Sequence, residues 1–218
     1  CGALVLVAAA CVLAVLGGGS RRTEYYDTQL EAARRLEGYF QAIRGYKEEL
    51  GIPMAEEDIH QTGMIGARFT GITTTVGAIE AKRTTAWPDM GALCVRLLYE
   101  AGVRPGDTVG AGFSGSFPGM NLALVAACES MDVELVCIAS VGASTFGATN
   151  PELTFPEMLW RLERDGLIET RSAAVTIGGD DDVGANMMDQ ELVRAVRARL
   201  LEEGLPLVEE PDFQKNLA

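Results

Sequence analysis

The sequence predicts an α/β fold in which helices cover both faces of a mostly parallel sheet. Three short apolar runs, typical of buried strands, alternate with segments of helical periodicity. The strand-like runs are 107–113, 133–140 and 172–179, and the helix-like segments are 117–130, 154–165 and 189–203. Strands that alternate with helices form parallel sheets, so we expect a three-layer, Rossmann-like arrangement.

Local signals mark several element boundaries. Thr154-Phe155-Pro156-Glu157 has the pattern of a capping box with proline in the first turn. Pro88-Asp89 opens an earlier helix, which Gly102 ends. Residues 62–80 are rich in Gly, Thr and Ile, which favours strands and turns, and residues 205–210 are expected to add an edge strand.

The chain divides into three parts. The first 19 residues carry no charge, and this length is close to the roughly 20 residues of a membrane-spanning helix. We expect a single-pass membrane anchor at 1–19, with a cleaved signal peptide as the alternative. Residues 20–50 form an amphipathic helix, either a stalk or part of the fold, and residues 51–218 form the α/β domain.

Composition narrows the possible functions. The formal net charge is −13, from 31 acidic and 18 basic residues, which argues against a nucleic-acid partner. The single histidine, His60, leaves one candidate for a histidine-based triad. Five cysteines without a CxxC pair are expected to be buried free thiols. We expect no cofactor.

Three glycine-rich loops follow the three predicted strands. They are 112–118 (GFSGSFP), 140–150 (SVGASTFGATN) and 178–184 (GGDDDVG). Parallel strands place their carboxyl ends at one edge, where open α/β sheets bind ligands. We therefore expect a single cleft there, with helix N-termini that favour an anion.

The loop at 112–118 allows three interpretations. Ser116 can cap the helix that follows Phe117-Pro118, which would be a structural role alone. Ser114, Gly115 and Ser116 can instead cradle an anion or carboxylate. Ser114 or Ser116 can also be a nucleophile, although Ser116 stands where the G-x-S-x-G elbow needs its last glycine.

Other side chains are candidates for the walls of this cleft. Lys82 and Arg83 would supply local positive charge. The remaining candidate ligand-binding residues are Thr74, Asn121, Ser144 and Asp181. Asp180-Asp181-Asp182 could hold a divalent cation, but adjacent side chains point in different directions, so we expect a solvated loop and no metal.

Three runs of the sequence resemble the poly-γ-glutamate system protein family. They are ITTTVGAIEAKRTTAWPDMGAL, AGVRPGDTVGAGFSGSFPGMNLALVAACES and SVGASTFGATNPELTFPEM, and the resemblance covers roughly 62–184. The family is found alongside the machinery that makes and exports poly-γ-glutamate, and its members have a similar N-terminal hydrophobic segment. The resemblance implies a pathway and membrane partners, but no catalytic residue.

Three functions follow from these observations. The first is a membrane-anchored accessory protein of poly-γ-glutamate synthesis or export, with a cleft for a carboxylate or phosphate. The second is a serine-dependent hydrolase or transferase that acts on γ-glutamyl amides, with His60, Lys82 or an aspartate of 180–182 as its base. The third is a purely structural subunit of the membrane complex.

Overall fold

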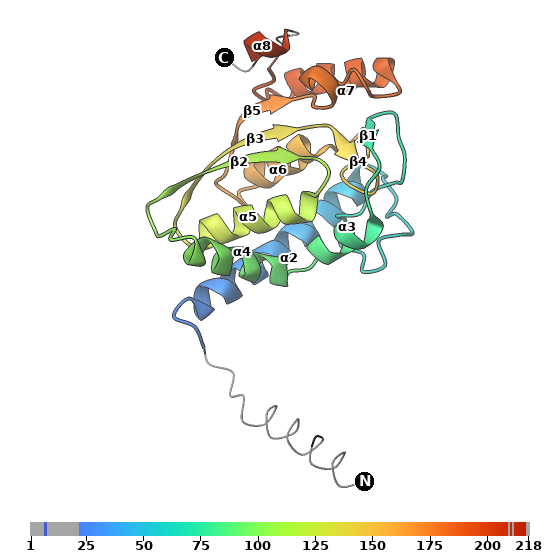
Figure 1. The fold of residues 1–218 in the computed structure, drawn as a ribbon. Helices are drawn as coiled ribbons and strands as arrows, with labels where there is room; N and C mark the ends of the chain where they lie inside the picture. The colour runs from blue at the N-terminus through green and yellow to red at the C-terminus, as the bar shows by residue number, and fades with distance from the viewer. Residues whose placement is uncertain (1–6, 8–21, 209, 211, 217–218) are drawn as a thin grey trace.

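The structure, a computed structural model, describes residues 7, 22–208, 210 and 212–216 (Figure 1). Apart from Val7, the expected anchor at 1–19 lies outside this part of the chain. No helix among the described residues has the length and apolar character needed to cross a membrane.

A mixed α/β fold with parallel strands is confirmed. One sheet has the order β2-β3-β5 and a smaller one pairs β1 with β4, and all of these pairings are parallel. The strands are β1 (Thr73–Thr75), β2 (Thr108–Ser114), β3 (Glu134–Ser140), β4 (Ala143–Ser144) and β5 (Ser172–Thr176). The helices are α2 (Tyr26–Glu49), α3 (Ile79–Thr85), α4 (Asp89–Glu100), α5 (Pro118–Ser130), α6 (Phe155–Arg164), α7 (Gln190–Glu202) and α8 (Phe213–Asn216).

Two expected strand regions are smaller than predicted. In residues 62–80 the only strand is the three-residue β1, and α3 begins at Ile79. In residues 205–210, Leu207 forms only an isolated parallel bridge with Val175. The described residues of this segment therefore border β5 without forming a strand.

The prediction of helices on both faces of the sheet is wrong for the described residues. The face of β3 that carries Leu135, Cys137 and Ala139 is buried in the core with α5 and α6. The opposite face leaves Val136 and Ile138 45% and 50% exposed. On β2 the corresponding positions are Thr, Gly, Gly and Ser, which bury little apolar surface and create little need for a covering helix.

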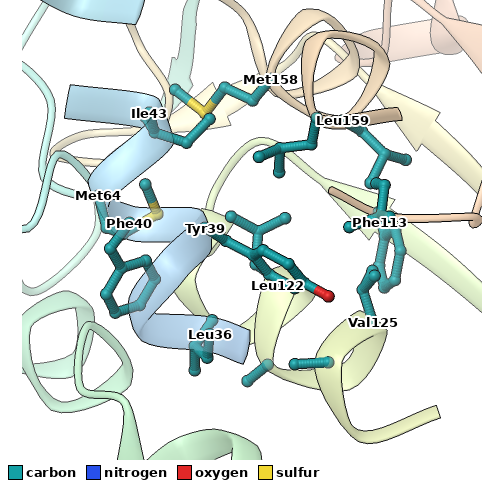
Figure 2. Close-up of a cluster of buried hydrophobic side chains, with 14 of the residues drawn as sticks. Leu36, Tyr39, Phe40, Ile43, Met64, Phe113, Leu122, Val125, Met158 and Leu159 are labelled. Atoms are coloured by element: carbon teal, nitrogen blue, oxygen red, sulfur yellow. The ribbon is translucent and has the colours of Figure 1, made fainter. Parts of the chain in front are cut away.

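Helix α2 is part of the fold rather than a separate stalk. Its apolar face, spaced at helical intervals, packs on α4 and α5 and buries Leu36, Phe40 and Ile43. Figure 2 shows Ile43 of α2 near Met158 of α6 and Tyr39 of α2 near Leu122 of α5, whereas Phe40 lies on the side of Met64. Helices α2 and α4 thus form a layer beneath α5 (Figure 1).

The capping box at the start of α6 is confirmed, and it also joins α6 to α7. The buried carboxylate of Glu157 accepts hydrogen bonds from Thr154 N (2.7 Å) and Thr154 Oγ1 (2.6 Å). Arg199 Nε of α7 lies 2.5 Å from the second oxygen of this carboxylate. The Glu157 carboxylate therefore accepts a backbone hydrogen bond at the N-terminus of α6 and also forms an ion pair with Arg199 of α7.

The cysteines of the domain are buried free thiols, as predicted. Cys94, Cys128 and Cys137 form no disulfide, and burial raises the pKa of Cys94 to about 11. A thiol with so high a pKa forms little thiolate at neutral pH and is therefore a weak nucleophile. Cys1 and Cys11 lie outside the described residues.

The close approach of α2 and α4 can be tested at two glycines. A Cβ on Gly91 would lie 2.7 Å from the Ala32 carbonyl oxygen, whereas a Cβ on Gly45 would meet nothing within 4 Å. Gly91→Ala should lower the free energy of unfolding by about 1–3 kcal/mol through overpacking. Gly45→Ala, the matched control within α2, should raise it by about 0.5–1 kcal/mol. Denaturant unfolding of both variants measures this, and equal stabilities would contradict the packing of α2 as a core helix.

Candidate functional site

The three loops that follow β2, β3 and β5 meet at the carboxyl edge of the sheet. A Cβ on Gly115 would lie 2.9 Å from the Val141 carbonyl oxygen, so the first and second loops touch. A Cβ on Gly142 would lie 3.1 Å from Gly179 N, so the second and third loops touch as well. Glycine at both positions allows this close approach, because a neighbouring backbone lies where a side chain would begin.

Ser114 and Ser116 hold the first loop against the second. Their hydroxyl oxygens lie 2.9 Å apart, and Ser116 N donates to Ser114 Oγ over 3.2 Å. Ser144 N donates to Ser116 Oγ over 3.0 Å. The interpretation of Ser116 as a helix cap is wrong, because Phe117 occupies the N-cap position of α5 and no side chain caps that helix.

Lys82 of α3 reaches into the same junction. Its Nζ donates to the Ser116 carbonyl oxygen and lies 2.6 Å from Ser144 Oγ. The ring centroid of Phe117 lies 3.8 Å from Nζ, close enough for a cation–π contact. We call Lys82, Ser116 and Ser144 the Lys82 cluster.

The ammonium group of Lys82 is buried, and no described residue supplies a counter-ion. The residue is 3% exposed, and it forms no ion pair with any described residue. Burial lowers the pKa of Lys82 to about 8. Removing a charge from water disfavours its charged form, and no carboxylate opposes this effect here.

The segment before α3 closes over the Lys82 cluster. A Cβ on Gly77 would lie 2.9 Å from Ser144 Oγ and 3.2 Å from Lys82 Cε. Thr145 fixes this segment, since its Oγ1 accepts from Gly77 N (2.8 Å) and donates to Gly77 O (3.0 Å). The absence of a side chain at Gly77 therefore allows the backbone to lie against the lysine–serine pair.

Two of the other predicted residues hold the backbone of the junction. Asn121 Nδ2 donates to the Ser114 carbonyl oxygen over 2.8 Å. Thr74 Oγ1 of β1 donates to the Ala143 carbonyl oxygen over 3.2 Å. Both side chains are thereby committed to bonds within the protein.

Arg83 and Asp181 are not part of the Lys82 cluster. The guanidinium of Arg83 donates to the Glu57 carbonyl oxygen, through Nε at 3.0 Å and Nη2 at 2.8 Å. Asp181 is exposed in a 3₁₀ turn, with a left-handed φ of 55°. His60, considered as a base, packs against Trp87 instead, with ring centroids 4.3 Å apart and the ring planes tilted by 52°.

The backbone N–H groups that we expected to bind an anion donate hydrogen bonds within the protein instead. Ser116 N and Ser144 N bind serine hydroxyls, and Gly142 N donates to the Ile177 carbonyl oxygen over 2.9 Å. The start of α5 is covered as well, since a Cβ on Gly119 would lie 2.5 Å from the Thr85 carbonyl oxygen. Lys82 is therefore the group at this junction that can attract an anion.

Sequence reasoning missed Gly77, Phe117 and Thr145 as parts of this site. Thr145 and Gly77 are 68 residues apart, and no spacing pattern in the sequence predicts their contact. The sequence did offer one signal for Gly77: it is a glycine between the threonine-rich strand and Lys82, and such a glycine can mark a close approach of the backbone.

Comparisons with known proteins find no counterpart: no protein-family model, no curated protein and no solved structure matches the chain. The resemblance to poly-γ-glutamate system proteins therefore rests on the three sequence runs alone.

Proposed function

We propose that the α/β domain binds a carboxylate at the Lys82 cluster. The observation that carries this proposal is the buried ammonium of Lys82, which has no counter-ion among the described residues. A buried charge is costly unless it is paired, and a bound anion would supply the missing partner. With a pKa of about 8, Lys82 is largely protonated at neutral pH and can donate to that anion.

The proposed ligand is a carboxylate of a glutamyl chain, bound by an accessory protein of poly-γ-glutamate synthesis or export. The resemblance of residues 62–184 to that family supports the pathway, and membrane proteins of the same machinery are the proposed partners. The acidic chain, with a net charge of −13, would limit general adhesion to an anionic polymer. Binding would then depend on a local cation.

A carboxylate would reach Lys82 from the side of Phe117. This ring lies against Nζ and is 37% exposed, so its rotation would uncover the ammonium. The exposed hydroxyl of Ser114, which is hydrogen-bonded to the hydroxyl of Ser116, would be the first contact of an arriving ligand. Ligand binding would thus replace a cation–π contact with a charge-assisted hydrogen bond.

Binding of γ-glutamyl oligomers to the full chain tests this assignment. Lys82→Met should lower their affinity by at least about tenfold, since a hydrogen bond to a charged group contributes about 1.5–3 kcal/mol. Ser114→Ala should cost only about 0.5–1.5 kcal/mol, the value of one neutral hydrogen bond. Lys215→Met is the matched control, because it makes the same change of charge at an exposed lysine.

Calorimetric titration with glutamyl oligomers, and with inorganic phosphate as a second anion, gives these affinities. Equal affinities for the Lys82→Met and Lys215→Met variants would reject the Lys82 cluster as the site. Tighter binding of phosphate than of the oligomers would reject the carboxylate as its ligand.

A second candidate function is favoured by the distance of 2.6 Å between Lys82 Nζ and Ser144 Oγ. A neutral lysine can act as the base for a serine nucleophile. Ser144 Oγ would attack the carbonyl carbon of a γ-glutamyl amide and pass its proton to Lys82, which would then protonate the departing amine. Water or another amine would release the acyl group from Ser144.

The two functions differ in their products. Incubation of the full chain with a γ-glutamyl oligomer should release no new amine if the protein only binds. Release of amine that disappears in Ser144→Ala, while oligomer affinity persists, would establish catalysis instead.

We also propose that the protein is anchored in a bacterial cell membrane through residues 1–19. The uncharged stretch of nearly spanning length supports this proposal. Expressed with its native N-terminus, the chain should sediment with membranes and resist extraction by high salt or carbonate. A chain that begins at Thr23 should stay in the supernatant. Recovery of both forms in the supernatant would contradict the anchor.

A further inference from the structure

A second concave site lies on the face of the sheet that helices leave uncovered, at the carboxyl ends of the strands. Its volume is about 530 Å³, within the range of small-molecule sites. It is lined by Gly112, Phe113, Ser114, Ile138, Ser140, Ala174, Thr176, Asp182 and Val208. We call it the sheet hollow. It shares Ser114 with the neighbourhood of the Lys82 cluster, but it does not contain Lys82.

Three hydroxyls form one row across the sheet hollow. The strand register aligns Ser114 with Ser140 and Ser140 with Thr176, on the uncovered face. Thr176 is only 7% exposed, and its hydroxyl has no hydrogen-bond partner among the described residues. Because Thr176 belongs to the lining of the hollow, its hydroxyl is available to a ligand there.

The charge of the sheet hollow is negative. Asp182 is the one charged side chain in its lining, and within the described part of the chain its carboxylate forms neither an ion pair nor a hydrogen bond. Ile138 and Ala174 lie next to the hydroxyl row and supply an apolar floor. The hollow therefore combines one carboxylate, several hydroxyl acceptors and aliphatic surface.

We propose that the sheet hollow binds the ammonium group of a primary amine. An ammonium has three donors and no acceptor, which matches a carboxylate together with hydroxyl oxygens. The apolar floor would contact the carbon atoms beside the nitrogen. A carboxylate ligand would meet Asp182 without any compensating cation in the lining, so the hollow excludes the kind of group that the Lys82 cluster attracts.

The ammonium can belong to a free amine or to the amino end of a peptide chain. Both present the same three donors, so the hollow does not distinguish them by charge. The proposal stands apart from the carboxylate site, because its recognition depends on Asp182 and Thr176 and not on Lys82.

Titration of the full chain by amide NMR tests the proposal with butylamine, butyrate and butanol at equal ionic strength. Butylamine should shift the amide signals of Ser140, Thr176 and Asp182 saturably, and butyrate should not shift them; the Ser114 signal is left out because Ser114 also borders the Lys82 cluster. Asp182→Asn should weaken this binding at least fivefold, and Thr176→Val should weaken it measurably. Asp181→Asn is the matched control, since it removes the same charge one residue away and outside the lining.

The remaining signals of each variant report whether the fold is intact. Glycylglycine amide and its N-acetyl derivative separate the two sources of the ammonium. Tighter binding of the free peptide than of butylamine would identify a chain end, and tighter binding of butylamine a free amine. Binding of butyrate or of the acetylated peptide at the same sites, or equal losses in Asp181→Asn and Asp182→Asn, would overturn the proposal.

Discussion

The contacts of the Lys82 ammonium determine how the carboxyl edge of this protein is assembled. One nitrogen joins α3, the turn after β2 and the strand β4, through the Ser116 carbonyl and the Ser144 hydroxyl. This junction links the small sheet to the large one. The cation at this junction has no counter-ion in the described part of the chain, and burying an unpaired charge costs free energy that a purely structural contact does not need to spend. The same group that holds the loops together is therefore the one best suited to meet a ligand.

The two proposed sites have opposite electrostatic character. The Lys82 cluster is a buried cation behind the ring of Phe117. The sheet hollow instead presents the carboxylate of Asp182 and several hydroxyl groups on an uncovered face of the sheet. Ser114 borders both of them. Each site can therefore be tested separately, with a ligand that carries only a carboxylate or only an ammonium.

Much of the fold could be predicted from the sequence because its signals are local. The capping box at Thr154 and Glu157 needs only four residues, and the strand β3 needs only an apolar run. The uncovered face was not predicted, because Val136 and Ile138 are as apolar as their buried neighbours. An apolar run of this length looks the same whether one face is covered or both. The covering of a face depends on where distant helices pack.

The location of the candidate site could be predicted, but its chemistry could not. Strand ends and glycines indicated the edge of the sheet, and Lys82 and Ser144 were both candidates. Their contact joins residues 62 positions apart, which no local pattern encodes. The expected backbone cradle failed for a similar reason, since Thr85 covers the start of α5 from a different helix.

Titration of the Lys82 side chain by NMR tests the central claim most directly, with the Lys82→Met variant to assign its signal. In the free protein the pKa should lie near 8, because burial disfavours the ammonium. A bound carboxylate favours the charged form, so saturation with a γ-glutamyl oligomer should raise the pKa toward the usual lysine value of about 10.4. By linkage, oligomer affinity should then fall as the pH rises above 8. A free-protein pKa near the usual value, or a pKa that the oligomer leaves unchanged, would contradict the account.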